Sequence, residues 1–243
     1  MAAASGTTPP RVAVVQHTAV CPPGRVGDWL REDGCDLDVF RCHAGEGLPT
    51  TLEPYAALVV LGGEMGAYDD VRHPWLTPTK DLLAAAVAAG LPTLGICLGL
   101  QLLAVACGGS VAPAAAGPQL GVRAVEPTAA AGDDPLLHDL APGAAGVHWN
   151  NDLVVDLPPG AVVLSTSAGT VQALRLGDAA WGLQHHPEVD PATLRLWADA
   201  DVAGGLLDPA AATSRLAEVE RRDAELALTW RAVVGRFADL VTG

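Results

Sequence analysis

The chain is poor in several residue types, and each scarcity excludes a class of function. Lys80 is the only lysine, and 14 basic residues stand against 28 acidic ones, which leaves a formal net charge of −14. Such a surface repels phosphate backbones and anionic lipid, so neither nucleic acid nor a membrane surface is expected as a partner. The longest apolar run, residues 82–89, is far shorter than the roughly 20 residues that a membrane-spanning helix needs.

The cysteines form no pair with the spacing of a zinc or redox site. They are Cys21, Cys35, Cys42, Cys97 and Cys107. An odd number excludes a fully paired disulfide framework and favours a reducing compartment. Residues 1–10 have neither the basic nor the apolar region of a secretory signal. We therefore expect a cytoplasmic protein with a flexible N-terminus over residues 1–10.

Short apolar runs alternate with helical patterns, which is typical of a doubly wound α/β sheet. Buried strands are expected at residues 12–16, 37–41, 56–61, 92–96 and 180–185, and helices at 27–32, 78–89 and 100–106. The pattern then changes to shorter strands and Pro/Gly turns, expected at 121–126, 153–156, 161–165 and 171–175. This change indicates a small antiparallel addition. With no internal repeat and no long linker, one domain over residues 1–243 is expected.

Capping residues mark where several helices begin and end. Thr77 is expected to cap a helix that begins at Pro78 and ends at Gly90. Two aspartate–proline pairs each combine an N-cap with a first-turn proline. They are Asp190-Pro191 and Asp208-Pro209. We therefore expect two C-terminal helical segments over residues 190–243, the second with one break.

The segment GICLG places a cysteine on a tight turn between an expected strand and an expected helix. This is the G-x-nucleophile-x-G arrangement, in which Gly95 and Gly99 remove a collision between side chains. The turn leaves Cys97 at a helix N-terminus, where free N–H groups and the macrodipole favour the thiolate. The N–H of Leu98 is then expected to point at a developing oxyanion. Alone, the motif leaves a buried structural cysteine open as the alternative.

The segment QHHPE ends the last expected strand and supplies a base and a carboxylate. Neighbouring side chains on a strand point to opposite faces, so only one of His185 and His186 can face Cys97. Pro187 is expected to end the strand at His186, at the carboxyl edge where α/β active sites lie. Glu188, two residues further on, can turn back on the imidazole. We predict His186 as the base and Glu188 as its orienting group, with His185 in a packing or supporting role.

In this order the motifs resemble those of the class I (triad) glutamine amidotransferases, in particular free-standing members similar to the amidotransferase domain of GMP synthase. The resemblance rests on LGG with Met65 at residues 61–65, GICLGLQ at 95–101 and GLQHHPEV at 182–189. Residues 149–152 and 165–172 also resemble the free-standing members, so nearly the whole chain is covered. The implied fold is a three-layer α/β/α sandwich of flavodoxin-like type with a mainly parallel sheet.

The resemblance implies that Cys97 attacks the side-chain amide of glutamine, forming a γ-glutamyl thioester and releasing ammonia. His186 would transfer the proton, and Glu188 would hold His186. Water would then release glutamate. No metal or organic cofactor is implied, and the ammonia is expected to pass to a separate synthase subunit or to be released.

The same resemblance assigns an oxyanion loop and a substrate contact. Gly62 and Gly63 belong to the loop, and the N–H groups of Gly63 and Leu98 would bind the oxyanion. Gln101 would contact the substrate glutamine.

Three departures from the family pattern bear on the substrate. His185 stands where an aromatic residue is usual, and Asn150-Asn151 stand where free-standing members usually have His-Gly. Glu64 follows the two glycines where many members have proline, and it brings a carboxylate to the oxyanion loop. A γ-glutamyl hydrolase acting on a substituted amide is therefore an alternative, and a non-catalytic regulatory subunit is another. Leu98 counts against the protease- and chaperone-like branch, which has histidine directly after its cysteine.

Other polar residues have a structural and a functional interpretation. His17 is expected to pack in the core. His148 and Trp149 either line the pocket or pack beneath it. Residues 69–75 are expected to form a solvated loop, with a lid as the alternative, and Trp197 is expected in the core.

Overall fold

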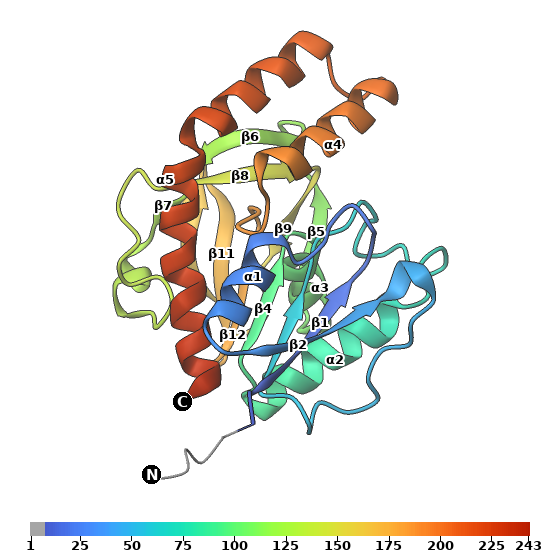
Figure 1. Ribbon diagram of the computed structural model, residues 1–243, viewed down its shortest axis with the longest axis vertical. Coiled ribbons are helices and arrows are strands. Elements are labelled where there is room, and N and C mark those ends of the chain that lie inside the picture. The colour runs from blue at the N-terminus through green and yellow to red at the C-terminus, as the bar shows by residue number, and fades with distance from the viewer. Residues whose placement is uncertain (1–7) are drawn as a thin grey trace, which may run out of the picture.

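A mainly parallel sheet forms the centre of the protein (Figure 1), which a computed structural model describes over residues 8–243. Its strands are β1 (Arg11–Gln16), β2 (Asp36–Arg41), β3 (Ala57–Val60), β4 (Thr93–Ile96), β7 (Glu126–Pro127), β10 (Val162–Ser167), β11 (Thr170–Leu176) and β12 (Ala180–Leu183). The strand order is β2-β1-β3-β4-β12-β11-β10-β7. The first five run parallel, and the last three are antiparallel additions.

Helices α1, α2, α3 and part of α5 cover the two faces of this sheet. The helices are α1 (Gly24–Glu32), α2 (Leu76–Ala89), α3 (Leu98–Ala106), α4 (Pro191–Ala203) and α5 (Pro209–Thr242), with short 3-10 turns η1 (Cys42–Ala44) and η2 (Ala129–Asp133). Val12 and Val14 of β1 enter the hydrophobic cluster shared with α1 and α5. Ala13 and Val15 enter the cluster shared with α2 and α3. Because alternate residues are buried on opposite faces, the expected three-layer α/β/α sandwich is confirmed.

Two small antiparallel sheets extend the central one. β5 (Ser110–Pro113) pairs with β9 (Asp152–Asp156), and β6 (Gln119–Ala124) pairs with β8 (Ala145–Asn150). The antiparallel addition is therefore confirmed. The single strand expected at 121–126 is wrong in detail, because its residues divide between β6 and β7. β5 and β8 were not expected, since neither has a long β-branched run and both depend on their partner strands.

The start of α2 differs from the expected cap. The helix begins at Leu76, after Trp75, and no side chain caps it. Thr77 instead donates its hydroxyl hydrogen to Asp70 at 2.7 Å. The expected end is confirmed, because Gly90 adopts a left-handed conformation with φ 65°. α3 likewise begins at Leu98, two residues earlier than expected.

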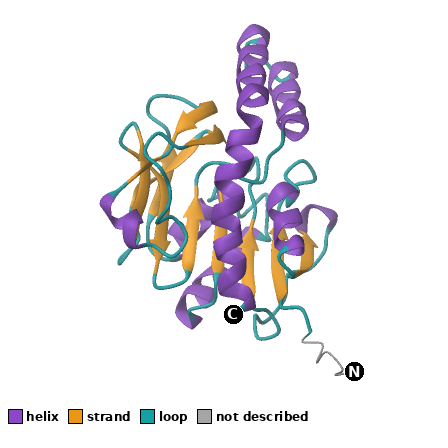
Figure 2. Cartoon of the chain, turned by 60° about the vertical axis from the view of Figure 1, so that its left-hand side comes forward, coloured by secondary structure: helices purple, strands orange, loops and turns teal. Residues whose placement is uncertain are grey.

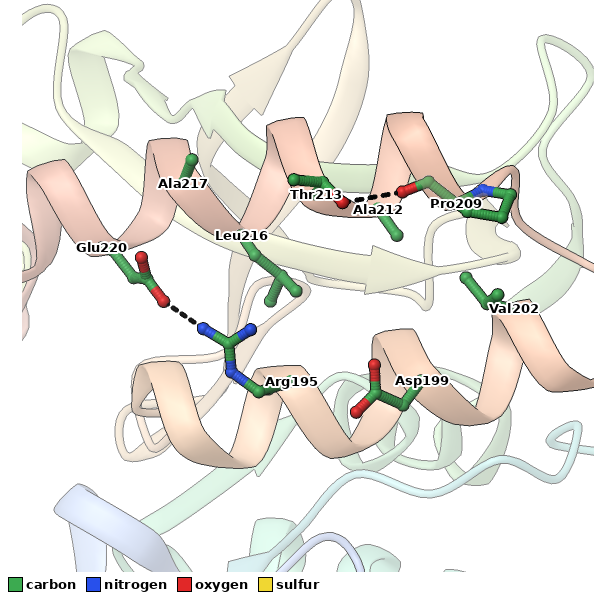
Figure 3. A pocket seen from close by; sticks show the side chains of 9 residues that line it. All are labelled: Arg195, Asp199, Val202, Pro209, Ala212, Thr213, Leu216, Ala217 and Glu220. Atoms are coloured by element: carbon green, nitrogen blue, oxygen red, sulfur yellow. Dashed lines mark hydrogen bonds and ion pairs between the residues drawn. The ribbon is translucent and has the colours of Figure 1, made fainter.

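The two C-terminal helices form a hairpin that projects beyond the sheet (Figure 2). Their caps are confirmed, since Asp190 accepts a hydrogen bond from Thr193 N–H at 2.7 Å and Asp208 accepts one from Ala211 N–H at 2.9 Å. The expected break in the second helix is wrong, because α5 is continuous over 34 residues. One part of it packs on α4 and β6, and another part covers the sheet beside α1. Arg195 of α4 pairs with Glu220 of α5 across the hairpin (Figure 3).

Within residues 8–243, no helix combines the length and the hydrophobicity needed to cross a bilayer. Most of the N-terminal segment expected to be flexible, residues 1–7 of 1–10, lies outside the described residues.

Candidate active site

Cys97 lies on a strained turn between β4 and α3. Its backbone has φ 51° and ψ −105°, a conformation that L-residues rarely adopt. A Cβ atom on Gly95 would lie 2.6 Å from the backbone of Gly99, and one on Gly99 would lie 2.1 Å from the carbonyl oxygen of Val60. Only glycine fits at either position, so the expected nucleophile-type turn is confirmed in its geometry.

His186 and Glu188 form a buried hydrogen-bonded pair beside this turn. The Nδ1 atom of His186 lies 2.7 Å from Oε1 of Glu188, and both side chains are almost fully buried. β12 ends at Leu183 rather than at residue 185 as expected. The chain then leaves the ladder, and His186 N–H donates to the Val147 carbonyl of β8 at 2.7 Å. The unexpected strand β8 therefore helps to position His186.

Two negatively charged neighbours favour the protonated form of His186. Burial alone would lower the pKa of His186, but the negative charges of Glu188 and Cys97 raise this pKa to about 10. Nδ1 is engaged by Glu188. The other ring nitrogen, Nε2, is buried, and the contact of His186 with the Cys97 side chain contributes to the raised pKa.

These residues border a cavity with two adjoining chambers. Both chambers are lined by Gly63, Glu64, Cys97, Trp149 and Asp201. The apolar chamber, of about 140 Å³, adds His186, Val20, Cys21, Leu196, Trp197 and Ala200. The polar chamber, of about 310 Å³, adds several side chains that hydrogen-bond, among them Gln101, Asn150, Asn151 and Asp152. Cys97 therefore lies where the two chambers meet.

The glycine loop lies directly against the turn. A Cβ atom on Gly62 would lie 3.1 Å from Cε1 of His186, and one on Gly63 would lie 3.0 Å from Cδ2 of Leu98. Leu98 is the first residue of α3, so its N–H has no acceptor within the helix. The structure therefore brings together Gly62, Gly63 and Leu98, as the resemblance implied.

Comparison with known sequences decides the family. Residues 26–196, more than half of the chain, match the family model described as glutamine amidotransferase class-I. This match includes the Cys97 turn and the His186–Glu188 segment. The chain belongs to the class I glutamine amidotransferases.

Similar proteins within and around this family carry several names. The glutamine amidotransferase-like protein YfeJ of Salmonella typhimurium is 32% identical over 188 residues, 73% of this chain and 75% of that protein. Gamma-glutamyl peptidase 4 of Arabidopsis thaliana is 28% identical over 86% of this chain and 83% of the peptidase. A glutamine-hydrolysing GMP synthase subunit of Sulfolobus acidocaldarius is 39% identical over 57% of this chain and 70% of its own length.

The fold agrees with that of solved amidotransferases. The crystal structure of a glutamine amidotransferase from Methylobacillus flagellatus superimposes with a TM-score of 0.85 at 29% identity, covering 97% of this chain and 96% of that one.

Two buried glutamines reach the Cys97 region of this amidotransferase. Gln101 lines the polar chamber, and its amide nitrogen donates to the carbonyl of Asp152 at 3.0 Å. Gln184 was not predicted as a site residue, yet its amide nitrogen contacts Sγ of Cys97 at 3.6 Å. Gln184 stands two residues before His186, but the chain bends at residues 184 and 185, so strand alternation alone could not assign it to the site.

Of the other cavity residues of the amidotransferase, Trp149 lines both chambers, which is one of the two positions expected for it, whereas Cys21 had no motif to reveal it. Trp149 donates its indole N–H to Asp201 at 2.8 Å, which joins β8 to α4 over the cavity. Trp197 belongs to a hydrophobic cluster, as expected, but it also packs against His186 with ring centroids 4.8 Å apart. Cys21 comes from the loop before α1, and burial raises the pKa of its thiol. These residues come from distant parts of the chain.

Three further histidines pack as neutral groups behind the site. His185 lies 4.0 Å from the Trp230 ring, which confirms its packing role, and burial lowers its pKa. His148 lies 5.8 Å from His185 and does not line the cavity; burial and the nearby His186 lower its pKa to about 3. His17 packs beneath the glycine loop, as expected, and burial followed by the charge of His73 lowers its pKa to about 4.

The loop expected at residues 69–75 is fastened to the body of the amidotransferase. Asp70 pairs with Lys80 of α2 at 2.8 Å, and Asp69 accepts a hydrogen bond from Gly66 N–H at 2.8 Å. These contacts favour a fixed loop over a lid.

Proposed function

We propose that this protein hydrolyses the γ-amide of glutamine, or of a γ-glutamyl compound, through a covalent thioester on Cys97. The observation that carries the proposal is the buried 2.7 Å contact between His186 and Glu188 beside a cysteine on a strained turn. Residues 1–243 act as one catalytic domain in this proposal. No metal or organic cofactor takes part.

The proposed steps conserve protons and electron pairs. The Cys97 thiolate attacks the amide carbon, and the N–H groups of Gly63 and Leu98 stabilise the oxyanion. The C–N bond breaks as His186, held by Glu188, protonates the leaving nitrogen through Nε2. Water then attacks the thioester, His186 takes its proton, and glutamate leaves as the thiolate is restored.

The first test compares two cysteines at opposite ends of one helix. Ammonia release from glutamine, and amine release from γ-glutamyl amides, is measured for wild type, Cys97→Ala and Cys107→Ala. The Cys97 variant is expected to lose at least about 10³-fold in kcat. Cys107 closes the far end of α3, so its variant is expected to retain activity. Unchanged hydrolysis by Cys97→Ala contradicts the proposal.

A labelling experiment addresses the alternative of a non-catalytic regulatory protein. A glutamine-analogue alkylator is expected to modify Cys97 in wild type, detected by mass spectrometry, and substrate is expected to protect it. A folded protein that carries no label on Cys97 indicates a regulatory protein that has kept the fold without the chemistry.

The γ-glutamyl hydrolase alternative has its own support. Ammonia is about the size of a water molecule, whose share of liquid volume is about 30 Å³, whereas the apolar chamber beside His186 has about 140 Å³. The Arabidopsis relative is named a gamma-glutamyl peptidase. Comparing kcat/KM on glutamine with kcat/KM on γ-glutamyl amines separates the two activities.

Location and partner follow from the substrate. With five cysteines unpaired, we place the protein in the cytoplasm. If glutamine is the preferred substrate, its ammonia passes to a separate synthase subunit, since one relative is a subunit of GMP synthase. Co-purification of a synthase that raises glutamine hydrolysis tests this.

A further inference from the structure

We infer that the substrate is a γ-glutamyl conjugate of an aliphatic diamine, and that Glu64 and Asp201 select its distal ammonium group. This inference rests on the proposed function, because it assigns the leaving group of that same reaction.

The volume and the lining of the apolar chamber suit a methylene chain. The chamber adjoins His186, where the proposed reaction protonates the leaving nitrogen. Val20, Leu196 and Trp197 contribute apolar wall, and Leu196 is 61% exposed in the absence of a ligand. About 140 Å³ accommodates a chain of several carbons, because a single water-sized group occupies only about 30 Å³ of liquid. A small apolar amine is therefore favoured over free ammonia.

The charge of the cavity selects among such amines. Glu64 and Asp201 line both chambers, and within residues 8–243 no lysine or arginine lines either one. Two carboxylates that line one cavity without a basic residue attract a cation and repel an anion. A γ-glutamyl diamine is therefore favoured, and a γ-glutamyl peptide, whose leaving group ends in a carboxylate, is disfavoured.

Both carboxylates retain oxygens for a ligand. Asp201 uses Oδ2 to accept the Trp149 indole N–H at 2.8 Å, which orients the group, while Oδ1 accepts no hydrogen bond from the described part of the chain. Glu64 is exposed and forms no ion pair or hydrogen bond with any residue in 8–243. The sequence raised Glu64 as a departure from the family pattern, and the structure adds Asp201 in the lining of the same cavity.

Two buried side chains line the two chambers. Asn150 is 5% exposed, and its Oδ1 forms no hydrogen bond in the described structure. His186 is 4% exposed, and its Nε2 is the proton donor of the proposed reaction. Buried polar atoms left unpaired cost free energy that a bound partner recovers. Asn150 lines the polar chamber and suits the α-ammonium of the γ-glutamyl group. His186 lines the apolar chamber and suits the leaving nitrogen, so the two halves of the substrate are assigned to different chambers.

Helix α4 supplies a matched control for Asp201. Leu196, Trp197, Ala200 and Asp201 lie on the helix face that borders the cavity. Asp199 lies in the separate pocket between α4 and α5 (Figure 3). A negative charge can therefore be removed from the same helix either inside the cavity, at Asp201, or outside it, at Asp199.

The test compares substrates that differ only in the charge of the leaving group. Initial rates are measured on N-(γ-glutamyl)-1,4-diaminobutane, its neutral isostere N-(γ-glutamyl)-pentylamine, γ-glutamylalanine and glutamine. Wild type is expected to prefer the diamine conjugate over the neutral isostere by about tenfold in kcat/KM, and less at high salt. Glu64→Gln and Asp201→Asn are each expected to lower this ratio at least threefold, mainly by raising KM for the diamine conjugate. Asp199→Asn is expected to leave it unchanged.

The outcomes separate this inference from the proposed function. Equal kcat/KM on the diamine and pentylamine conjugates, or preference for γ-glutamylalanine, overturns the inference and leaves γ-amide hydrolysis standing. A folded wild type that cleaves none of the substrates overturns the proposed function. In that event, titration calorimetry with 1,4-diaminobutane decides the inference: binding lost in Asp201→Asn and kept in Asp199→Asn supports the carboxylate site, and absence of binding to wild type overturns it.

Discussion

At the scale of single residues, Cys97 stores strain at the centre of the site. Its φ of 51° lies in a region that costs a non-glycine residue on the order of 1–3 kcal/mol. Packing between the turn and β3 leaves no relaxed alternative, because Gly99 is in contact with the Val60 backbone. Cys97 N–H also donates to the Leu183 carbonyl at 2.7 Å, which ties the turn to β12. These contacts hold the strained turn in place, with the sulfur of Cys97 at the ends of the strands.

A pair of substitutions measures this strain. Cys97→Gly is expected to be more stable than Cys97→Ala by about 1 kcal/mol, because glycine alone adopts a positive φ without cost. Neither variant has the thiol, so the comparison isolates the backbone. The measurement is urea unfolding of both proteins. An alanine variant that is as stable as the glycine variant, or more so, shows that the turn is not strained.

At the scale of elements, α4 forms one wall of the candidate site. Its N-cap is Asp190, two residues after Glu188, and the Asp190 carboxylate accepts a hydrogen bond from Thr193 N–H at 2.7 Å. The helix therefore starts beside the His186–Glu188 pair and carries Trp197 and Asp201 over the cavity. Its N-cap controls both the stability of the helix and the wall of the cavity.

Removing this cap is expected to destabilise the protein. Asp190→Ala is expected to lower the free energy of unfolding by about 1 kcal/mol, because an N–H of the first turn loses its acceptor. Asp199→Ala, in the middle of the same helix and exposed, is expected to change it by less than about 0.5 kcal/mol. Chemical unfolding checks both values. Equal effects at the two positions mean that the cap does not stabilise α4.

At the scale of the whole molecule, buried neutral histidines make the stability of the folded protein depend on pH. His17, His148 and His185 are completely buried, and the pKa values of His17 and His148 fall to about 4 and about 3. The folded protein therefore keeps these imidazoles neutral at a pH where the unfolded chain, with histidine pKa near 6.5, binds protons. Their contribution to stability is present above pH ~6.5 and is lost as the pH falls toward these lowered values.

Replacing one of these histidines is expected to flatten the pH dependence. His185→Phe keeps an aromatic ring against Trp230 and removes the titrating group. Between pH 7 and pH 5, wild type is expected to lose more unfolding free energy than the variant, because burial holds the pKa of His185 well below that of the unfolded chain. Urea unfolding at the two pH values tests this. Identical losses in both proteins indicate that His185 accepts a proton while the protein is folded.

The features that the sequence alone determined are local in the chain. Gly95, Cys97 and Gly99 predicted the tight turn because its steric demands involve adjacent residues. The spacing of His186 and Glu188 predicted their contact for the same reason, and the two aspartate–proline caps depend on hydrogen bonds within four residues. The family motifs therefore led directly to the turn, the paired side chains and the three-layer fold.

Tertiary structure alone decided what surrounds these motifs. β8 forms because β6 is beside it, and α5 remains continuous because α4 and the sheet cover it. Val20, Trp149 and Asp201 have no common pattern in the sequence, and only folding brings them to one cavity. Local sterics and capping can be read from neighbouring residues, but the walls of a cavity depend on packing between distant segments. The turn that carries Cys97 was therefore predictable, whereas the cavity behind the proposed diamine selectivity was not.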